Sequence, residues 1–282
     1  MNPEPTIRTG PADAGLQPSL NIPGGASEGA PIIQLVDLHK GFSGRPVLQG
    51  LTLDVLRGET LCVIGGSGTG KSVTLKHIVG LLRPDKGTVI ISGTDIFAAN
   101  NGQLGEIRKK IGFLFQGAAL LNSLTVFENV ALPLREHERP AEEEIRRRVT
   151  ETLEMVNLAD AAEKMPDVIS GGMKKRAGLA RAIIRKPEII LYDEPTAGLD
   201  PIMAATINEL VLDLQAKLKV TSLVVTHDMS SVFRIADRIA LLHEGRVHKI
   251  GTKEEFKKSD DTKVTKFIYG DSEGPLRREE AK

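Results

Sequence analysis

Cysteine, net charge and long apolar runs are all scarce in this sequence, and each scarcity excludes a class of protein. The single cysteine among 282 residues, Cys62, cannot form a disulfide within the chain, which fits a reducing compartment. The chain has 37 lysines and arginines and 37 aspartates and glutamates, so it carries no excess of basic residues. Its overall charge therefore gives no reason to expect nucleic acid as the main partner. No stretch approaches the roughly 20 apolar residues of a membrane helix, and the N-terminus lacks the apolar core of a signal peptide. We therefore expect a soluble chain that acts on a membrane only through a partner.

The first 31 residues differ in composition from the rest of the chain. Eleven of them are proline or glycine, a share above that of ordinary globular sequence. We expect residues 1–31 to be disordered. The whole chain is 40% hydrophobic, enough for one large core or for one core with a smaller lobe.

Beyond residue 31 the apolar patterns predict two kinds of strand. Alternation at residues 32–36 and 47–56, around a turn at 42–46, predicts an antiparallel pair. Continuous apolar runs predict buried strands, which are expected at residues 61–64, 89–91, 111–115, 189–192 and 223–226. Helical patterns lie between the later runs, so a parallel sheet with crossover helices is expected.

From Ser123 to about Pro166 the pattern becomes helical, which predicts an inserted helical subdomain at about residues 118–168. Within it, three glutamates at 142–144 precede three arginines at 146–148 by four residues each, the favourable order for ion pairs on a helix. This charge run is typical of a solvated helix face rather than of a nucleic-acid site.

Residues 65–72 read GGSGTGKS, a complete phosphate-binding loop placed between an apolar strand and a helical pattern. The glycines let backbone N–H groups point inward, and the following helix adds the positive end of its dipole. Lys71 then reaches the β- and γ-phosphates, and Ser72 offers its hydroxyl to Mg²⁺. A glycine-rich turn without a ligand is the alternative, but the context predicts a nucleoside triphosphate site.

Polar side chains end three other apolar strands. Asp193 suits Mg²⁺, directly or through water, and Glu194 can accept a proton from the attacking water, although an acidic strand end before a proline turn is the alternative. His227 can orient that water at the γ-phosphate, although a lone histidine is usually structural. Gln116 can ligate Mg²⁺ or position water, but taken alone it indicates nothing. The sequence Ser170-Gly171-Gly172-Met173 precedes a helix and is either a second anion site or merely a flexible cap.

Together these motifs resemble those of ATP-binding cassette (ABC) ATPases. In chain order they match the Walker A loop, Q-loop, signature, Walker B strand, D-loop and H-loop, over about residues 32–250. The resemblance implies an α/β fold with a P-loop NTPase (RecA-like) core, an antiparallel β subdomain and an inserted α-helical subdomain. It places the ATPase domain at residues 32–252 and a C-terminal tail at residues 253–282.

The resemblance also implies ATP and Mg²⁺ as cofactors and gives each residue a role. The catalytic residues would be Lys71, Glu194 and His227. The metal would be held by Ser72, Gln116 and Asp193. ATP would be bound by Phe42, which would stack on adenine, and by Gly65, Gly66, Ser67, Gly68, Thr69, Gly70, Lys71, Ser72, Val73 and Gln116. Two positions depart from the family pattern: Val73 replaces a frequent hydroxyl, and Met173 replaces the commonest glutamine of the signature.

In this family the signature serves the nucleotide of a second subunit. The resemblance therefore implies a head-to-tail homodimer, in which Lys71 of one chain and Ser170 of the other hold the same γ-phosphate. The signature is Ser170, Gly171, Gly172 and Met173, and Asp200 belongs to the D-loop. Closing on ATP and opening after hydrolysis is then a population shift between two states.

Some local strings resemble a narrower group, the ATPase subunits of Mla-type phospholipid transporters. They are residues 114–120, 125–136, 170–173 and 267–275. This resemblance implies a membrane permease whose coupling helices dock near Gln116, an MCE-domain lipid-binding protein, and a STAS-domain regulator. It also implies a location at the cytoplasmic face of the inner membrane, with no nucleic acid as partner.

Three other readings stay open. The chain can serve a transporter for another solute, which the ATP motifs do not exclude. A non-transport ABC ATPase of DNA repair or translation usually needs a coiled coil, a zinc insert or two cassettes, and the sole cysteine and single motif set argue against these. A binding module without hydrolysis is disfavoured because Glu194 and His227 are both present.

Overall fold

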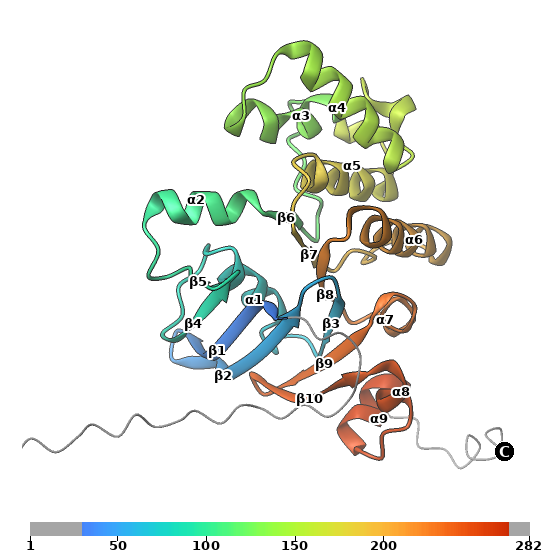
Figure 1. The fold of residues 1–282 in the computed structure, drawn as a ribbon. Helices are drawn as coiled ribbons and strands as arrows, with labels where there is room; N and C mark the ends of the chain where they lie inside the picture. The colour runs from blue at the N-terminus through green and yellow to red at the C-terminus, as the bar shows by residue number, and fades with distance from the viewer. Residues whose placement is uncertain (1–29, 271–282) are drawn as a thin grey trace, which may run out of the picture.

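A computed structural model of the chain describes residues 30–270, which form two sheets and a helical layer (Figure 1). Residues 1–29 and 271–282 lie outside the described part, and with them nearly all of the segment predicted to be disordered. Pro31, the last residue of that segment, is already the first residue of a strand. None of the helices in residues 30–270 is both long and apolar enough to cross a membrane.

The smaller sheet is antiparallel and forms the predicted β subdomain. Its strands, in spatial order β2-β1-β4-β5, are β2 Arg45–Leu56, β1 Pro31–Phe42, β4 Lys86–Ile91 and β5 Thr94–Asp95. The predicted pair at 32–36 and 47–56 is confirmed as β1 and β2, and both strands are longer than the alternating patterns.

The larger sheet has the spatial order β10-β9-β3-β8-β7-β6. These strands are β10 Arg246–Thr252, β9 Arg238–His243, β3 Thr60–Ile64, β8 Thr221–Val225, β7 Ile189–Asp193 and β6 Ile111–Leu114. Neighbours from β9 to β6 run parallel, and only β10 is antiparallel. The carboxyl ends of β3, β8, β7 and β6 therefore meet at one edge, where open α/β sheets bind ligands.

Apolar side chains cover both faces of the larger sheet, which explains the continuous apolar runs. In β3, Cys62 and Ile64 belong to a cluster with the helical layer, whereas Leu61 and Val63 belong to a cluster with the β subdomain. Every residue of β3, β7 and β8 is buried. A strand buried on both faces needs no polar alternation.

Helices flank the larger sheet and build the layer drawn at the top of Figure 1. The first seven are α1 Lys71–Ile78, α2 Asn101–Lys109, α3 Val126–His137, α4 Glu142–Met155, α5 Gly171–Ile183, α6 Pro201–Leu218 and α7 Met229–Ile235. Two short 3₁₀ turns, η1 Ala159–Ala161 and η2 Pro166–Val168, link α4 to α5. The helical insert predicted at about 118–168 corresponds to α3, α4 and these turns.

The charge run of α4 faces solvent in part, but its partners differ from the predicted ones. Arg147 pairs with Glu144 at 2.7 Å and with Glu151 at 2.6 Å. Arg148 instead lies half-buried, where it pairs with Glu138 at 2.7 Å and donates to the Ile184 carbonyl. The predicted pair of Glu144 with Arg148 does not form because Arg148 faces the packed side of the helix, and Arg147 pairs with Glu144 and Glu151 instead of with Glu143.

Residues 253–270, predicted to be part of a tail, form two helices. These are α8 Lys253–Lys257 and α9 Thr262–Tyr269. Phe256 and Val264 are fully buried in the core cluster on the helical face of the sheet. This part of the chain therefore adds to the packed core.

Candidate nucleotide site

The strand order brings four predicted motifs to one edge of the sheet. The phosphate loop follows β3, and Thr226 and His227 follow β8. Asp193 ends β7, Glu194 comes directly after it, and Gln116 follows β6 by two residues. These strands are neighbours in the order β3, β8, β7, β6. Motifs that lie up to 162 residues apart in sequence, from Gly65 to His227, thus share one surface.

The phosphate loop has the conformation that its glycines permit. Gly68 and Gly70 have φ of 78° and 98°, in the region that favours glycine. A Cβ on Gly70 would lie 2.5 Å from Leu48 Cδ2, so a side chain there would also have to displace the end of Leu48. Lys71 begins α1, and its Nζ donates to the carbonyls of Gly65 at 2.7 Å and Gly66 at 3.0 Å.

Burial lowers the pKa of Lys71, while the charges of Glu194 and Asp193 act in the opposite direction. The ammonium therefore lies within the field of both carboxylates as well as inside the loop. A cation in this position can compensate the negative charge of a bound phosphate.

The residues predicted to hold the metal include a pair in direct contact. Ser72 Oγ, on the first turn of α1, donates to Asp193 Oδ1 at the end of β7 over 2.9 Å. Burial raises the pKa of Asp193, and the Ser72 hydrogen bond opposes this shift.

The pair fits Mg²⁺ by its chemistry. A hydroxyl and a carboxylate are hard oxygen donors, and Mg²⁺ usually keeps waters and takes only one or two carboxylates beside substrate phosphates. No cluster of three or more His, Cys, Asp or Glu side chains suited to a metal occurs within residues 30–270. The fit is therefore to a nucleotide-bound cation rather than to a closed metal cage.

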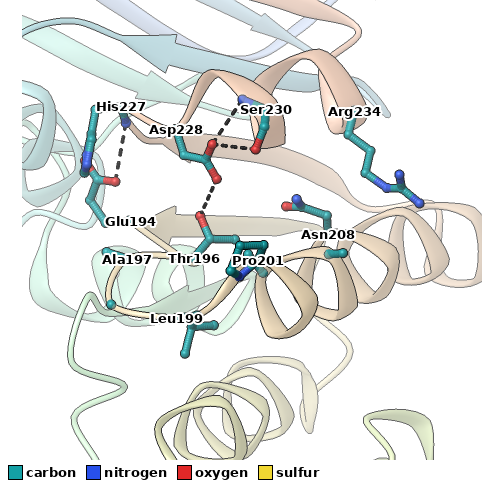
Figure 2. A pocket seen from close by; sticks show the side chains of 13 residues that line it. Glu194, Thr196, Ala197, Leu199, Pro201, Asn208, His227, Asp228, Ser230 and Arg234 are labelled. Carbon is teal, nitrogen blue, oxygen red and sulfur yellow. Dashed lines mark hydrogen bonds and ion pairs between the residues drawn. The ribbon is translucent and has the colours of Figure 1, made fainter.

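Glu194 and His227 form the second contact pair, drawn with a dashed line in Figure 2. His227 Nδ1 lies 2.9 Å from Glu194 Oε1, and Thr226 Oγ1 donates to Glu194 Oε2 at 3.0 Å. The Glu194 side chain is 11% exposed and the His227 side chain 67%. A nearly buried carboxylate thus points at an exposed imidazole, which is free to meet a ligand.

The backbone of Glu194 is strained. Its φ of 49° lies in the left-handed region, which costs a non-glycine residue about 1–3 kcal/mol and is concentrated at functional sites. Three contacts hold it: its N–H donates to the Val225 carbonyl at 2.8 Å, its carboxylate accepts from Thr226, and its carbonyl accepts from Lys175 Nζ.

Gln116 and Phe42 lie at the margins of this edge. Gln116 is exposed, and its carbonyl accepts a short hydrogen bond from Lys175 Nζ. Phe42 ends β1, is 44% exposed, and has Lys40 Nζ 5.7 Å from its ring centre. Its hairpin borders the phosphate loop, because Leu48 lies against Gly70.

The signature lies on a different part of the chain from the phosphate loop. Ser170 caps α5 by accepting from the Met173 N–H at 3.3 Å. A Cβ on Gly172 would overlap Met203 Cε, so the start of α5 packs closely on α6. In Figure 1, α5 lies beside α3 and α4, away from α1. Within residues 30–270, no hydrogen bond or ion pair joins the signature to residues 65–73.

Asp200 has a structural role in addition to the one predicted for the D-loop. Its Oδ1 accepts from the N–H groups of Ile202 and Met203, each at 3.0 Å, which caps α6. Val73 is half-buried, packs on the β subdomain cluster, and accepts at its carbonyl from the His77 ring at 2.7 Å.

Sequence reasoning missed the polar network behind the site. Asp228 accepts from Thr196 Oγ1 at 3.1 Å and from Ser230 Oγ at 2.7 Å (Figure 2). Ser231 Oγ donates to Asp228 and accepts from the buried Asn208 at 2.8 Å. Burial raises the pKa of Asp228, but the hydrogen bonds from Ser231, Ser230 and Thr196 outweigh it and hold the pKa below its usual value.

The network lines a cavity of about 440 Å³ that also reaches Glu194 and His227. Asp228 directly follows His227 in the sequence, and that position is the one signal that could have found it. The serine, threonine and asparagine carry no such signal.

Comparison with known proteins agrees with this geometry. The family model described as ABC transporter matches residues 48–197. A probable ribonucleotide transport ATP-binding protein, mkl, of Mycobacterium leprae is 42% identical over 250 residues, which cover 89% of this chain and 72% of that protein. The intermembrane phospholipid transport system ATP-binding protein MlaF of Haemophilus influenzae is 41% identical, covering 87% of this chain and 93% of that protein.

A solved structure extends the comparison to three dimensions. The ATP-binding cassette MJ0796, in a dimeric post-hydrolysis state bound to ADP and Pi, superposes with a TM-score of 0.72 at 35% identity, covering 78% of this chain and 98% of that chain. The matching family model, the identities and the shared fold lead to one conclusion. The chain belongs to the ABC transporter family, as its nucleotide-binding ATPase subunit.

Proposed function

We propose that the sheet edge binds ATP with Mg²⁺ and divides the work among the residues described above. The observation that carries this proposal is the pairing of Ser72 with Asp193 beside the pairing of Glu194 with His227. Lys71 and the loop N–H groups hold the phosphates, and Phe42 offers its exposed ring to adenine. Ser72 and Asp193, with the Gln116 side chain, would hold Mg²⁺, which neutralises phosphate charge when bound.

In this proposal Glu194 accepts the proton of the water that attacks the γ-phosphorus. The bond from that phosphorus to the bridging oxygen breaks, and ADP and phosphate leave. His227 orients the water and the γ-phosphate, since its ring contacts Glu194 and is otherwise exposed. Thr226 fixes the second carboxylate oxygen, so that the first is directed toward the imidazole.

We further propose that a homodimer completes each site. Ser170 and its neighbours form the start of α5, and this helix start does not contact the phosphate loop of its own chain. Such a separation is expected for a group that acts on the nucleotide of a second copy. The MJ0796 cassette is dimeric with ADP and Pi, which supports the same arrangement here. Asp200 lies at the start of α6, directly after the turn that follows Glu194, and would face the second copy.

We propose phospholipid as the cargo. MlaF of Haemophilus influenzae, a phospholipid transport protein by name, matches over 93% of its own length, and the strings at 114–120 and 125–136 point the same way. The mkl protein, named for ribonucleotide transport, is equally similar, so a transporter for another solute is the second candidate. The further partners in this proposal are a permease, a periplasmic MCE-domain protein and a STAS-domain regulator. The chain itself would lie at the cytoplasmic face of the inner membrane.

A groove beside Gln116 supports the contact with a permease. It measures about 370 Å³ and lies among β6, α3 and α5, with Phe113 and the 37% exposed Phe115 stacked at 4.1 Å on one side. Its basic lining residues are Arg108, Lys109, His137, Arg181 and Arg185. No carboxylate is among the described residues that line it, so an apolar segment with acidic side chains is the complementary occupant.

The cargo proposal is tested by purifying the tagged full chain from membranes of the cells that naturally produce it. The expected result is co-purification of a permease and an MCE-domain protein, together with detergent sensitivity and altered outer-membrane lipid after gene deletion. Recovery of a permease with a soluble-substrate binding protein, and unchanged envelope lipid, would overturn the lipid proposal but not the ATPase assignment.

A further inference from the structure

One buried lysine joins the two loops that carry Gln116 and Glu194. Lys175 lies on α5, five residues after the signature serine, and is 4% exposed. Its Nζ donates to the Glu194 carbonyl at 2.8 Å and, by a shorter bond, to the Gln116 carbonyl. A single ammonium thus spans the turn after β7 and the turn after β6.

The character of this contact is unusual for a lysine. The side chain forms no ion pair with a carboxylate of residues 30–270, and both of its acceptors are neutral peptide carbonyls. A buried charge needs hydrogen bonds to replace its water, so the two carbonyls and the ammonium hold one another in place. Burial lowers the pKa of Lys175, which the nearby Asp193 and Glu194 oppose.

A second cation of the same helix secures the same loop. Arg181 donates to the carbonyls of Ala118 and Ala119, each at 2.7 Å. Those two alanines have φ of 59° and 49°, a left-handed pair that needs external support. The helix that begins at the signature therefore holds residues 116–119 at both ends.

We infer that Lys175 is a positioning residue, which fixes the peptide of Gln116 and the peptide of Glu194 in register with the signature helix. The inference rests on the roles proposed for Gln116 and Glu194. A shift of the loop at residues 116–119, or of α5, then moves both groups together, and their joint placement at the γ-phosphate depends on one ammonium. Lys175 itself touches neither nucleotide nor metal in this scheme.

The test replaces Lys175 by methionine in the full chain and measures steady-state ATP hydrolysis. We expect Lys175→Met to lower kcat by about 10- to 100-fold, because small displacements of catalytic groups have effects of this size. KM for ATP stays nearly unchanged, because the phosphate loop is untouched. Lys175→Arg, which keeps a buried cation with several donors, restores most of kcat.

Lys174→Met is the matched control. Lys174 precedes Lys175 on the same helix, is half-buried, and has no side-chain hydrogen bond or ion pair within the described residues. We expect its kcat to equal that of the unmodified chain. An equal loss of kcat in both variants would overturn the inference.

A double variant separates positioning from a merely structural role. Because Lys175 acts in part through Gln116, Lys175→Met should lower kcat by a smaller factor in a Gln116→Ala background than in the unmodified chain, whereas fully independent effects would multiply. Multiplied effects, or a raised KM with unchanged kcat, would overturn the inference. Should Lys175→Met fail to fold, Lys175→Gln keeps one amide donor and is measured in its place.

The outcome is separable from the proposed function. Near-normal turnover by Glu194→Gln would overturn the catalytic roles on which the inference rests. Near-normal turnover by Lys175→Met, beside an inactive Glu194→Gln, would overturn the inference on Lys175 alone.

Discussion

Among single residues, Glu194 has the role that a conservative substitution isolates best. Glu194→Gln keeps the shape of the side chain but removes the proton acceptor, so turnover should fall by about 10²- to 10⁴-fold. ATP binding should remain, because Lys71 and the phosphate loop are intact, and a closed dimer should accumulate. Phosphate release and size-exclusion chromatography with ATP measure both effects.

Glu244→Gln provides the control for that experiment, since the Glu244 side chain is 78% exposed in the turn between β9 and β10. It should hydrolyse ATP at the unmodified rate. Turnover of Glu194→Gln close to that of Glu244→Gln would remove Glu194 from the role of general base.

Lys71 is expected to act one step earlier, in binding. Its ammonium lies among the loop carbonyls of Gly65 and Gly66, where a triphosphate would replace those contacts. Lys71→Ala should therefore abolish productive ATP binding, as measured by a fluorescent nucleotide. Lys217→Ala, at a 61% exposed side chain of α6, should bind normally. Equal nucleotide affinity of the two variants would contradict the role of Lys71.

At the scale of elements, one buried side-chain amide orders the segment that leads into the helical subdomain. Asn129 on α3 is fully buried, accepts from the Leu121 N–H, and donates to the carbonyls of Leu121, Leu124 and Thr125 at 2.9–3.0 Å. It thereby orders the turn that leads from residue 121 into the helix.

Asn129→Ala should lower the free energy of unfolding by about 1–3 kcal/mol, because the buried groups that it satisfied lose their partner. Urea titration followed by circular dichroism measures this loss. Glu128→Gln, which keeps the capping contact with the Thr125 N–H, is the control and should change little. Unchanged stability of Asn129→Ala would show that water replaces the amide.

At the scale of the whole molecule, the separation of the signature from the phosphate loop predicts complementation between chains. Ser170→Arg should suppress hydrolysis while leaving ATP binding by the isolated chain nearly unchanged. A mixed dimer with Lys71→Ala in one chain and Ser170→Arg in the other should keep one intact site. A mixed dimer with both changes in one chain should have two damaged sites.

The ATPase rates of the two mixed dimers, prepared with different affinity tags, decide this prediction. The first combination should be the faster. Greater activity of the second combination would contradict a site shared between chains.

The sequence alone determined the phosphate loop and the polar strand ends. Residues 65–72 are consecutive, and their glycines, lysine and serine act through local backbone geometry that no distant contact has to supply. Asp193, Glu194 and His227 were found for a similar reason, since each directly ends or follows an apolar strand. The resemblance that these motifs carry implied the fold class, and the comparisons confirmed it.

Only the tertiary structure decided which of these groups meet and what supports them. The order β3-β8-β7-β6, which no local pattern encodes, places Ser72 against Asp193 across 121 residues. In the sequence, Lys175 is indistinguishable from the other basic residues at the start of its helix. Its burial between two loops depends on how α5 packs on the sheet. Packing, unlike backbone conformation, is a property of segments distant in sequence, and it therefore became visible only in the folded chain.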